Sequence, residues 1–148
     1  MKRQALMILT TLSLFVMLTA TSVYAQSSTV QAANIPFEFI IGNKAFPAGA
    51  YTFTCQYTSL IQIQSQDRGE SMFVSTGPVD ARKTRNELVF NRYGDQYFLS
   101  TLWTEGDHVG RAVKMSRSER ALIQTRRALA ENSSEPQMVS VLMFEHKR

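Results

Sequence analysis

The feature that most constrains this chain is a regular alternation of apolar and polar residues. It is clearest where Tyr51, Phe53, Cys55 and Tyr57 share one face and threonine or glutamine occupies the positions between them. Side chains of a β-strand point alternately to its two faces, so this pattern predicts a half-buried strand whose aromatic side faces a core. A chain built from such segments is expected to form a sheet.

Further segments of this kind, separated by glycine, proline and polar turns, extend along the chain. We expect strands at 35–41, 51–57, 60–64, 71–75, 87–91, 96–103 and 137–144, with a further short one at 110–115. Seven to eight short strands favour an antiparallel sandwich or a small barrel. On the strand at 96–103, the alternation places Tyr97, Leu99, Thr101 and Trp103 on one face.

The periodicity changes near residue 116. Ser116 and Glu119 form the capping-box pattern that begins many helices. Apolar residues then recur at helical spacing, and arginines occupy the more exposed side. These arginines are Arg117, Arg120, Arg126 and Arg127. The pattern predicts a C-terminal amphipathic helix over about 117–131, covering one open end or one face of the sheet.

The N-terminus has the layout of a secretory signal peptide. Lys2 and Arg3 precede an apolar run over 5–18, and small residues flank Tyr24 before a cleavage site after Ala25. The apolar run is shorter than the roughly 20 residues of a membrane span. We therefore expect a signal peptide over 1–25, a flexible leader over 26–33 and a single β-rich domain over 34–148. The mature chain is expected to lack a membrane span and to be periplasmic or extracellular.

Composition removes several classes of function. The hydrophobic fraction of 44% excludes wholesale disorder. Removal of Lys2 and Arg3 lowers the net charge from +4 to +2, which argues against a nucleic-acid partner. The single cysteine excludes an internal disulfide framework and a multi-cysteine zinc site. We interpret Cys55 as a small buried hydrophobe, with an intermolecular disulfide as the alternative.

The sequence lacks a recognisable catalytic set. It contains neither a Gly-x-Ser-x-Gly elbow nor a glycine-rich phosphate loop. Glu105, Asp107 and His108 share one loop, which we interpret as a solvated turn because it lacks the spaced acids of a calcium loop. We predict no catalytic residue, no metal site and no cofactor.

The candidate ligand-binding residues surround one predicted hairpin at 87–103. They are Tyr93, Tyr97, Trp103, Arg92 and Asp95. Aromatic faces can stack on sugars or apolar ligands, whereas large aromatics on a central strand more often belong to a core. Both interpretations stay open for this cluster.

Two stretches of the sequence carry a resemblance. The first comprises NIPFEF at 34–39, GNK at 42–44 and PAGAY at 47–51; the second comprises LVFNRYGDQYFL at 88–99, Trp103, Gly110-Arg111 and Ser116-x-x-Glu119-Arg120. Together they resemble a group of small exported bacterial β-rich proteins, over roughly 34–120. That group carries no assigned activity. The resemblance therefore implies export and a β-rich fold, and it transfers no catalytic residue.

Three functional hypotheses follow from the sequence. The first is an exported, non-enzymatic binding or interaction domain with an unknown ligand or protein partner. The second is a small barrel that carries an apolar small molecule inside, lined by Phe53, Tyr97, Leu99 and Trp103. The third is a hydrolase that uses acidic residues together with His108.

Overall fold

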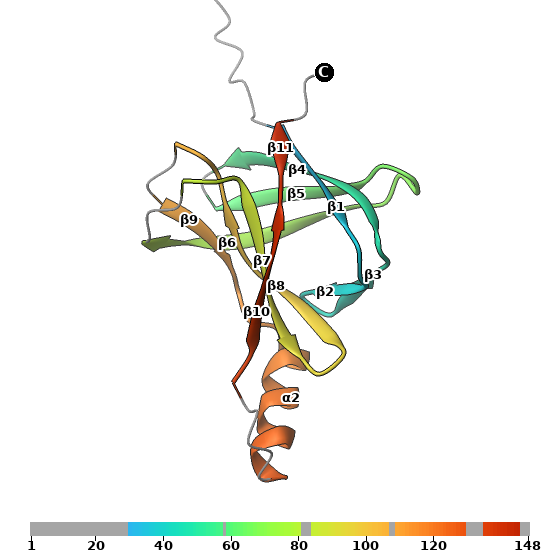
Figure 1. Cartoon of the computed structure of the whole chain (residues 1–148), viewed down its shortest axis with the longest axis vertical. Helices are drawn as coiled ribbons and strands as arrows, with labels where there is room; N and C mark the ends of the chain where they lie inside the picture. Colours follow the sequence, from blue (N-terminus) through green and yellow to red (C-terminus); the bar gives the residue numbers. More distant parts are fainter. Residues whose placement is uncertain (1–29, 58, 81–83, 107–108, 130–134, 146–148) are drawn as a thin grey trace, which may run out of the picture.

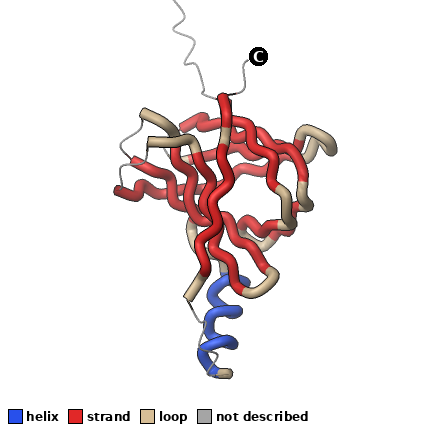
Figure 2. The backbone as a smooth tube through the Cα atoms, viewed as in Figure 1, coloured by secondary structure: helices blue, strands red, loops and turns tan. Residues whose placement is uncertain are grey.

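The computed structural model describes residues 30–57, 59–80, 84–106, 109–129 and 135–145 (Figure 1). These residues form a mainly β structure with one helix, as the sequence predicts (Figure 2). The strands are β1 (Val30–Ile35), β2 (Phe39–Ile41), β3 (Lys44–Phe46), β4 (Gly49–Tyr57), β5 (Leu60–Ser65), β6 (Ser71–Asp80), β7 (Glu87–Tyr93), β8 (Gln96–Trp103), β9 (Val109–Val113), β10 (Gln137–Leu142) and β11 (Phe144–Glu145). The helix, α2, is Arg117–Ala128.

The strands belong to one sheet with the order β10-β7-β8-β9-β6-β5-β4-β1-β11. The short β2–β3 hairpin is attached to the side of this path. The pairings are antiparallel except where β2 meets β8 through the parallel pair Ile40 and Phe98. The sheet is therefore mixed, whereas the sequence pattern suggested an antiparallel one.

The core lies on the face to which the alternating aromatic residues point. Phe39 is fully buried and contacts the rings of Phe46, Tyr51 and Phe90, with ring centroids 5.5, 5.0 and 5.6 Å away respectively. Phe53 is also fully buried in this cluster, as the alternation along β4 predicts. Aromatic side chains bury large apolar areas, so this cluster is the main source of stability of the sheet.

The first strand differs from expectation. Residues 30–33, expected to belong to a flexible leader, form most of β1, and the side chains of Gln31, Ala32 and Ala33 are buried there. The strand pairs with β4 over its whole length, which satisfies its backbone groups. The flexible-leader prediction is therefore wrong for these residues, and the remainder of 26–33 up to residue 29 lies outside the described residues.

The single strand expected at 35–41 is divided in two. β1 ends at Ile35 and β2 begins at Phe39, with Pro36 between them. Proline cannot donate a ladder hydrogen bond, which explains the interruption. The division and the short β3 and β11 strands raise the number of strands described to eleven, more than the seven to eight expected.

A β-bulge in β8 changes which side chains reach the core. The register with β7 passes from Val89–Thr101 to Phe90–Leu99, so Ser100 is the extra residue. The extra residue reverses the alternation beyond it. Leu102 therefore joins the core, and Trp103 lies on the opposite face from Leu99, so the prediction of one shared face is wrong.

The helix begins at the predicted residue but does not cover the sheet. It projects from one end of the sheet, and Glu119 is its only buried residue (Figure 1). The Ser116 hydroxyl accepts a hydrogen bond from the Glu119 backbone N–H at 3.0 Å, which confirms the predicted cap. The helix ends at Ala128, and residues 130–131 of the expected range lie outside the described residues. Within the described ranges, no helix is long and apolar enough to cross a membrane.

Candidate functional site

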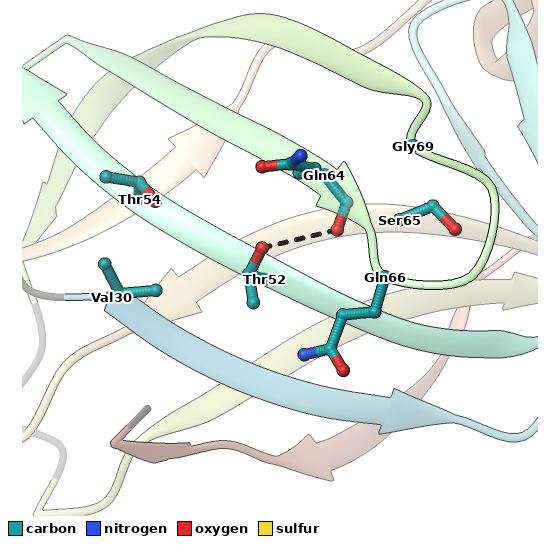
Figure 3. A pocket seen from close by; sticks show the side chains of 7 residues that line it. All are labelled: Val30, Thr52, Thr54, Gln64, Ser65, Gln66 and Gly69. Atoms are coloured by element: carbon teal, nitrogen blue, oxygen red, sulfur yellow. Dashed lines mark hydrogen bonds between the residues drawn. The ribbon is translucent and has the colours of Figure 1, made fainter. Parts of the chain in front are cut away.

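A pocket of about 320 Å³ lies on the outer face of the sheet, where β1, β4 and β5 run side by side (Figure 3). Its lining residues are Val30, Thr52, Thr54, Gln64, Ser65, Gln66 and Gly69. They come from the start of β1, the middle of β4, the end of β5 and the turn that follows it.

The strand alternation explains why the pocket is polar. Tyr51 and Phe53 of β4 point into the core, so Thr52 and Thr54 between them point outward. The register then places Thr52 opposite Gln64 of β5. The same pattern that builds the aromatic core therefore builds a polar outer surface across neighbouring strands.

The turn after β5 closes one side of the pocket and is tied to β4. The Gln66 backbone N–H donates to the Ala50 carbonyl at 2.9 Å, and the Ser65 N–H donates to the Glu70 carbonyl at 2.8 Å. Gly69 has a φ of 65°, in the left-handed region that glycine adopts without strain. These bonds fix the turn, so the pocket wall is formed before a ligand binds.

The lining offers hydroxyl and amide groups and carries no charge. The Thr52 hydroxyl donates to the Gln64 carbonyl at 3.4 Å, a long hydrogen bond. Within the described part of the chain, the side chains of Thr54, Gln64 and Gln66 have no hydrogen-bond partner. Hydroxyl and amide groups both donate and accept, so these three side chains can bind a neutral polar ligand. The described residues contain no cluster of His, Cys, Asp or Glu that could hold a metal ion.

The structure brings two of the five predicted ligand-binding residues together. The guanidinium carbon of Arg92 lies 5.4 Å from the centre of the Tyr97 ring. The Tyr97 ring also stacks against the Phe37 ring, with centroids 4.0 Å apart. All three side chains are half-buried. They form a small aromatic and arginine stack that covers the helix end of the core, next to Phe90.

Tyr93 is buried and hydrogen-bonded to the helix. Its side chain is 3% exposed, and its hydroxyl donates to Oε1 of Glu119 at 3.2 Å. Nδ2 of Asn91 donates to the same oxygen at 3.0 Å. Burial and then the neighbouring Glu119 carboxylate raise the pKa of Tyr93 to about 12. The Tyr93 hydroxyl therefore joins β7 to the helix, and the ligand contact predicted for Tyr93 stays a prediction.

Trp103 and Asp95 lie in different places. Trp103 is 6% exposed and packs over Gly110 of β9, far along β8 from Tyr97, so it is a packing residue. Asp95 is exposed in the turn between β7 and β8. The five residues therefore do not form one site, although the sequence places them around one hairpin.

The structural support for the other two hypotheses is limited to single residues. Phe53 and Leu99 are buried in the core, whereas Trp103 is on the opposite face, so the four residues expected to line an interior cavity do not share one. Glu105 is exposed, and its backbone N–H donates to the Asn86 side chain at 2.6 Å. Asp107 and His108 lie outside the described residues. Cys55 is half-buried and packs against the core.

The pocket residues were not among the sequence candidates. The alternation along 51–57 placed threonines on a polar face, but a polar strand face is ordinary on any sheet. Only the cross-strand register and the turn at 66–69 show that these side chains surround a hollow.

Comparisons with known proteins add no constraint. No protein-family model, no curated protein and no solved structure matches this chain. The resemblance to small exported bacterial proteins therefore stays a prediction.

Proposed function

We propose that this chain is an exported, non-enzymatic binding domain whose pocket on β1, β4 and β5 holds a neutral polar ligand. The observation that carries the proposal is the uncharged lining of hydroxyl and amide groups. Such groups satisfy the hydroxyls of a sugar or the amides of a peptide, and they offer nothing that attracts an ionic ligand. Of these two classes of ligand, sugar and peptide, we favour a neutral glycan.

The surface beside the pocket supports a glycan. The outward positions Val30, Thr54, Gln62 and Phe73 form one row across β1, β4, β5 and β6, because each is the register partner of the next. Phe73 is 53% exposed, so its ring is accessible at the end of this row. An exposed ring beside hydroxyl and amide groups suits a sugar, which has an apolar ring face and a polar edge.

The architecture that we propose for the sheet is the small barrel. β10 pairs with β7, β11 pairs with β1, and only Met143 separates β10 from β11 along the chain. The Met143 backbone N–H donates to the Asn86 carbonyl at 2.9 Å, so the chain continues from one pairing to the other without a loop. Closure removes the exposed sheet edges that promote aggregation.

Export is the part of the proposal that depends on the sequence. The signal-peptide layout ends at Ala25, and β1 begins at Val30, a few residues further on. Mass spectrometry of protein recovered from the periplasm or the medium should give the mass of Gln26–Arg148. A full-length mass in the cell and no material outside it would contradict export.

Binding is tested with the mature protein and a panel of neutral polysaccharides by titration calorimetry. We expect the double variant Thr54→Val, Gln64→Leu to weaken binding roughly tenfold or more, because two hydrogen bonds are lost. The matched control is Thr84→Val, Gln137→Leu, which changes the same residue types at exposed positions outside the pocket. Binding that is equally strong in both variants, or absent for every glycan in the panel, would overturn the proposal.

A further inference from the structure

The outer side of α2 is a region that the proposed function does not use. The helix projects from the sheet, and its residues other than Glu119 are half-buried or exposed (Figures 1 and 2). A solvated surface helix normally mixes positive and negative residues on its exposed side. This helix does not, and the difference identifies its outer side as a candidate interaction surface.

The anchoring of the helix decides which side is outward. The Glu119 carboxylate accepts hydrogen bonds from Asn91 and Tyr93 of β7, and the Ser118 hydroxyl donates to the Gly42 carbonyl at 3.3 Å. Leu122, Ile123 and Arg126 follow Glu119 at spacings of three, four and seven, so they share its face. All three are half-buried. The helix is therefore held with one defined face toward the sheet.

An exposed side of the helix next to that face carries a stripe of Arg117, Arg120, Gln124 and Arg127, which we call the arginine stripe. These residues follow one another at three- and four-residue spacings, and all are exposed. At a rise of 1.5 Å per residue, successive members lie about 4.5 to 6 Å apart along the axis. The acidic residue of the helix is Glu119, whose carboxylate is buried on the other side. The outward charge is therefore entirely positive.

We propose that the arginine stripe binds an acidic polysaccharide that carries one carboxylate per sugar unit. The stripe is a single line, so it matches a linear polymer. Its arginines are separated by three and then by seven residues, about 4.5 and 10.5 Å along the axis. These distances are close to the lengths of one and of two hexose units, and arginine forms bidentate pairs with carboxylates. A membrane surface is a poorer match, because a helix that inserts at an interface needs an outward apolar face, and Leu122 and Ile123 are on the face toward the sheet. This inference is independent of the pocket.

The test uses the mature protein and polygalacturonate, with affinity measured over a range of salt concentrations. We expect the triple variant Arg117→Gln, Arg120→Gln, Arg127→Gln to bind at least tenfold more weakly. The slope of log affinity against log salt should fall in magnitude by about 2, because each lost contact no longer releases about 0.7 of a condensed counterion. Glutamine has a helix propensity close to that of arginine, and circular dichroism confirms that the helix is retained.

The matched control removes the same charge from positions outside the helix. Lys44→Gln, Arg68→Gln, Arg85→Gln changes three exposed basic residues outside the helix, so the net charge falls equally. We expect this variant to keep the affinity and the salt slope of the parent protein. Equal losses in both variants would show that only net charge matters and would overturn the proposal.

Two further probes separate the alternative occupants. Neutral dextran should not bind to the stripe, so any binding to it should be unchanged in the arginine variant. Vesicles of phosphatidylglycerol and phosphatidylcholine should bind more weakly than polygalacturonate. Arginine-dependent binding to these vesicles without binding to polygalacturonate would overturn the proposal and identify a lipid surface as the partner of the stripe.

Discussion

The sheet and the helix of this protein are held in place by different forces. In the sheet, Phe39 and Phe53 are fully buried within a continuous apolar cluster. In the helix, the single buried side chain is the carboxylate of Glu119, which is held by two hydrogen bonds to β7. Burial of apolar area stabilises by about 25 cal/mol per Å², whereas a hydrogen bond contributes a net of about 1 kcal/mol.

One chain therefore contains a part that is stabilised by a large apolar core and a part that depends on a few polar contacts. Substitutions in the core should unfold the whole molecule. Substitutions around Glu119 should release the helix while the sheet stays folded. Local opening of this kind is expected for elements with few buried apolar contacts. The following predictions test this contrast.

The largest effect is expected for Phe39→Ala. The ring of Phe39 is fully buried against three other rings, so its removal leaves a cavity that costs about 3–5 kcal/mol in the free energy of unfolding. Urea denaturation followed by circular dichroism measures the loss. Phe73→Ala is the control, because that ring is 53% exposed and its removal should change stability by less than about 1 kcal/mol. Similar losses in the two variants would contradict the assignment of the core.

Gly110→Ala tests packing on the other face of the sheet. A Cβ atom at this position would overlap the Trp103 ring, so the ring must move, at a cost of about 1–3 kcal/mol. Tryptophan fluorescence should shift, and the melting temperature should fall. Gly77→Ala is the matched control on the neighbouring strand β6, where a Cβ atom meets nothing within 4 Å. An unchanged fluorescence spectrum in Gly110→Ala would place Trp103 elsewhere.

Tyr93→Phe tests the link between the two regions. The substitution keeps the ring and removes the hydroxyl that donates to Glu119, which costs about 1 kcal/mol. Hydrogen exchange should accelerate at the backbone amides of α2 and stay nearly unchanged in β4 and β5. Tyr57→Phe is the control, because that side chain is 67% exposed. Uniform acceleration across the molecule would mean that the helix and the sheet unfold together.

The sequence predicts the elements of both regions better than it predicts the contacts between them. The alternation at 51–57 depends on neighbouring residues, and so does the cap formed by Ser116 and Glu119; both are confirmed. The bonds from Glu119 to Asn91 and Tyr93 join residues 28 and 26 positions apart. No local pattern encodes such a pairing. The sequence therefore identifies Glu119 as part of the cap but does not show that its carboxylate also anchors the helix to β7.

The candidate site illustrates the same limit. The threonines at 52 and 54 are predicted to point away from the core, and they do. The pocket also requires the register of β4 with β5 and the position of the turn at 66–69, which depend on the whole sheet. The bulge at Ser100 was missed because it has no glycine or proline to mark it. It moved Trp103 away from the face where the alternation had placed it.

Alkaline pH should loosen the same link that Tyr93→Phe removes. Burial and the Glu119 carboxylate raise the pKa of Tyr93 to about 12, above its ordinary value of 10. The folded protein therefore favours the neutral phenol, so this contribution to stability is complete below pH 10 and is lost as the pH rises through about 12. Ultraviolet difference titration should show a late tyrosine phase that is absent in Tyr93→Phe. A late phase that persists in this variant would assign it to another tyrosine.

The smallest effect, and the only expected gain, concerns Thr76→Val. The Thr76 hydroxyl is buried in β6 at 6% exposure, and within the described residues it has no hydrogen-bond partner. A buried polar group without a partner has lost its hydration and gained nothing in return, so replacement by an apolar group of the same shape should stabilise the sheet by about 1 kcal/mol. Thermal unfolding measures the gain, and Thr54→Val in the pocket should show none. A loss of stability in Thr76→Val would mean that a buried water molecule bonds to this hydroxyl.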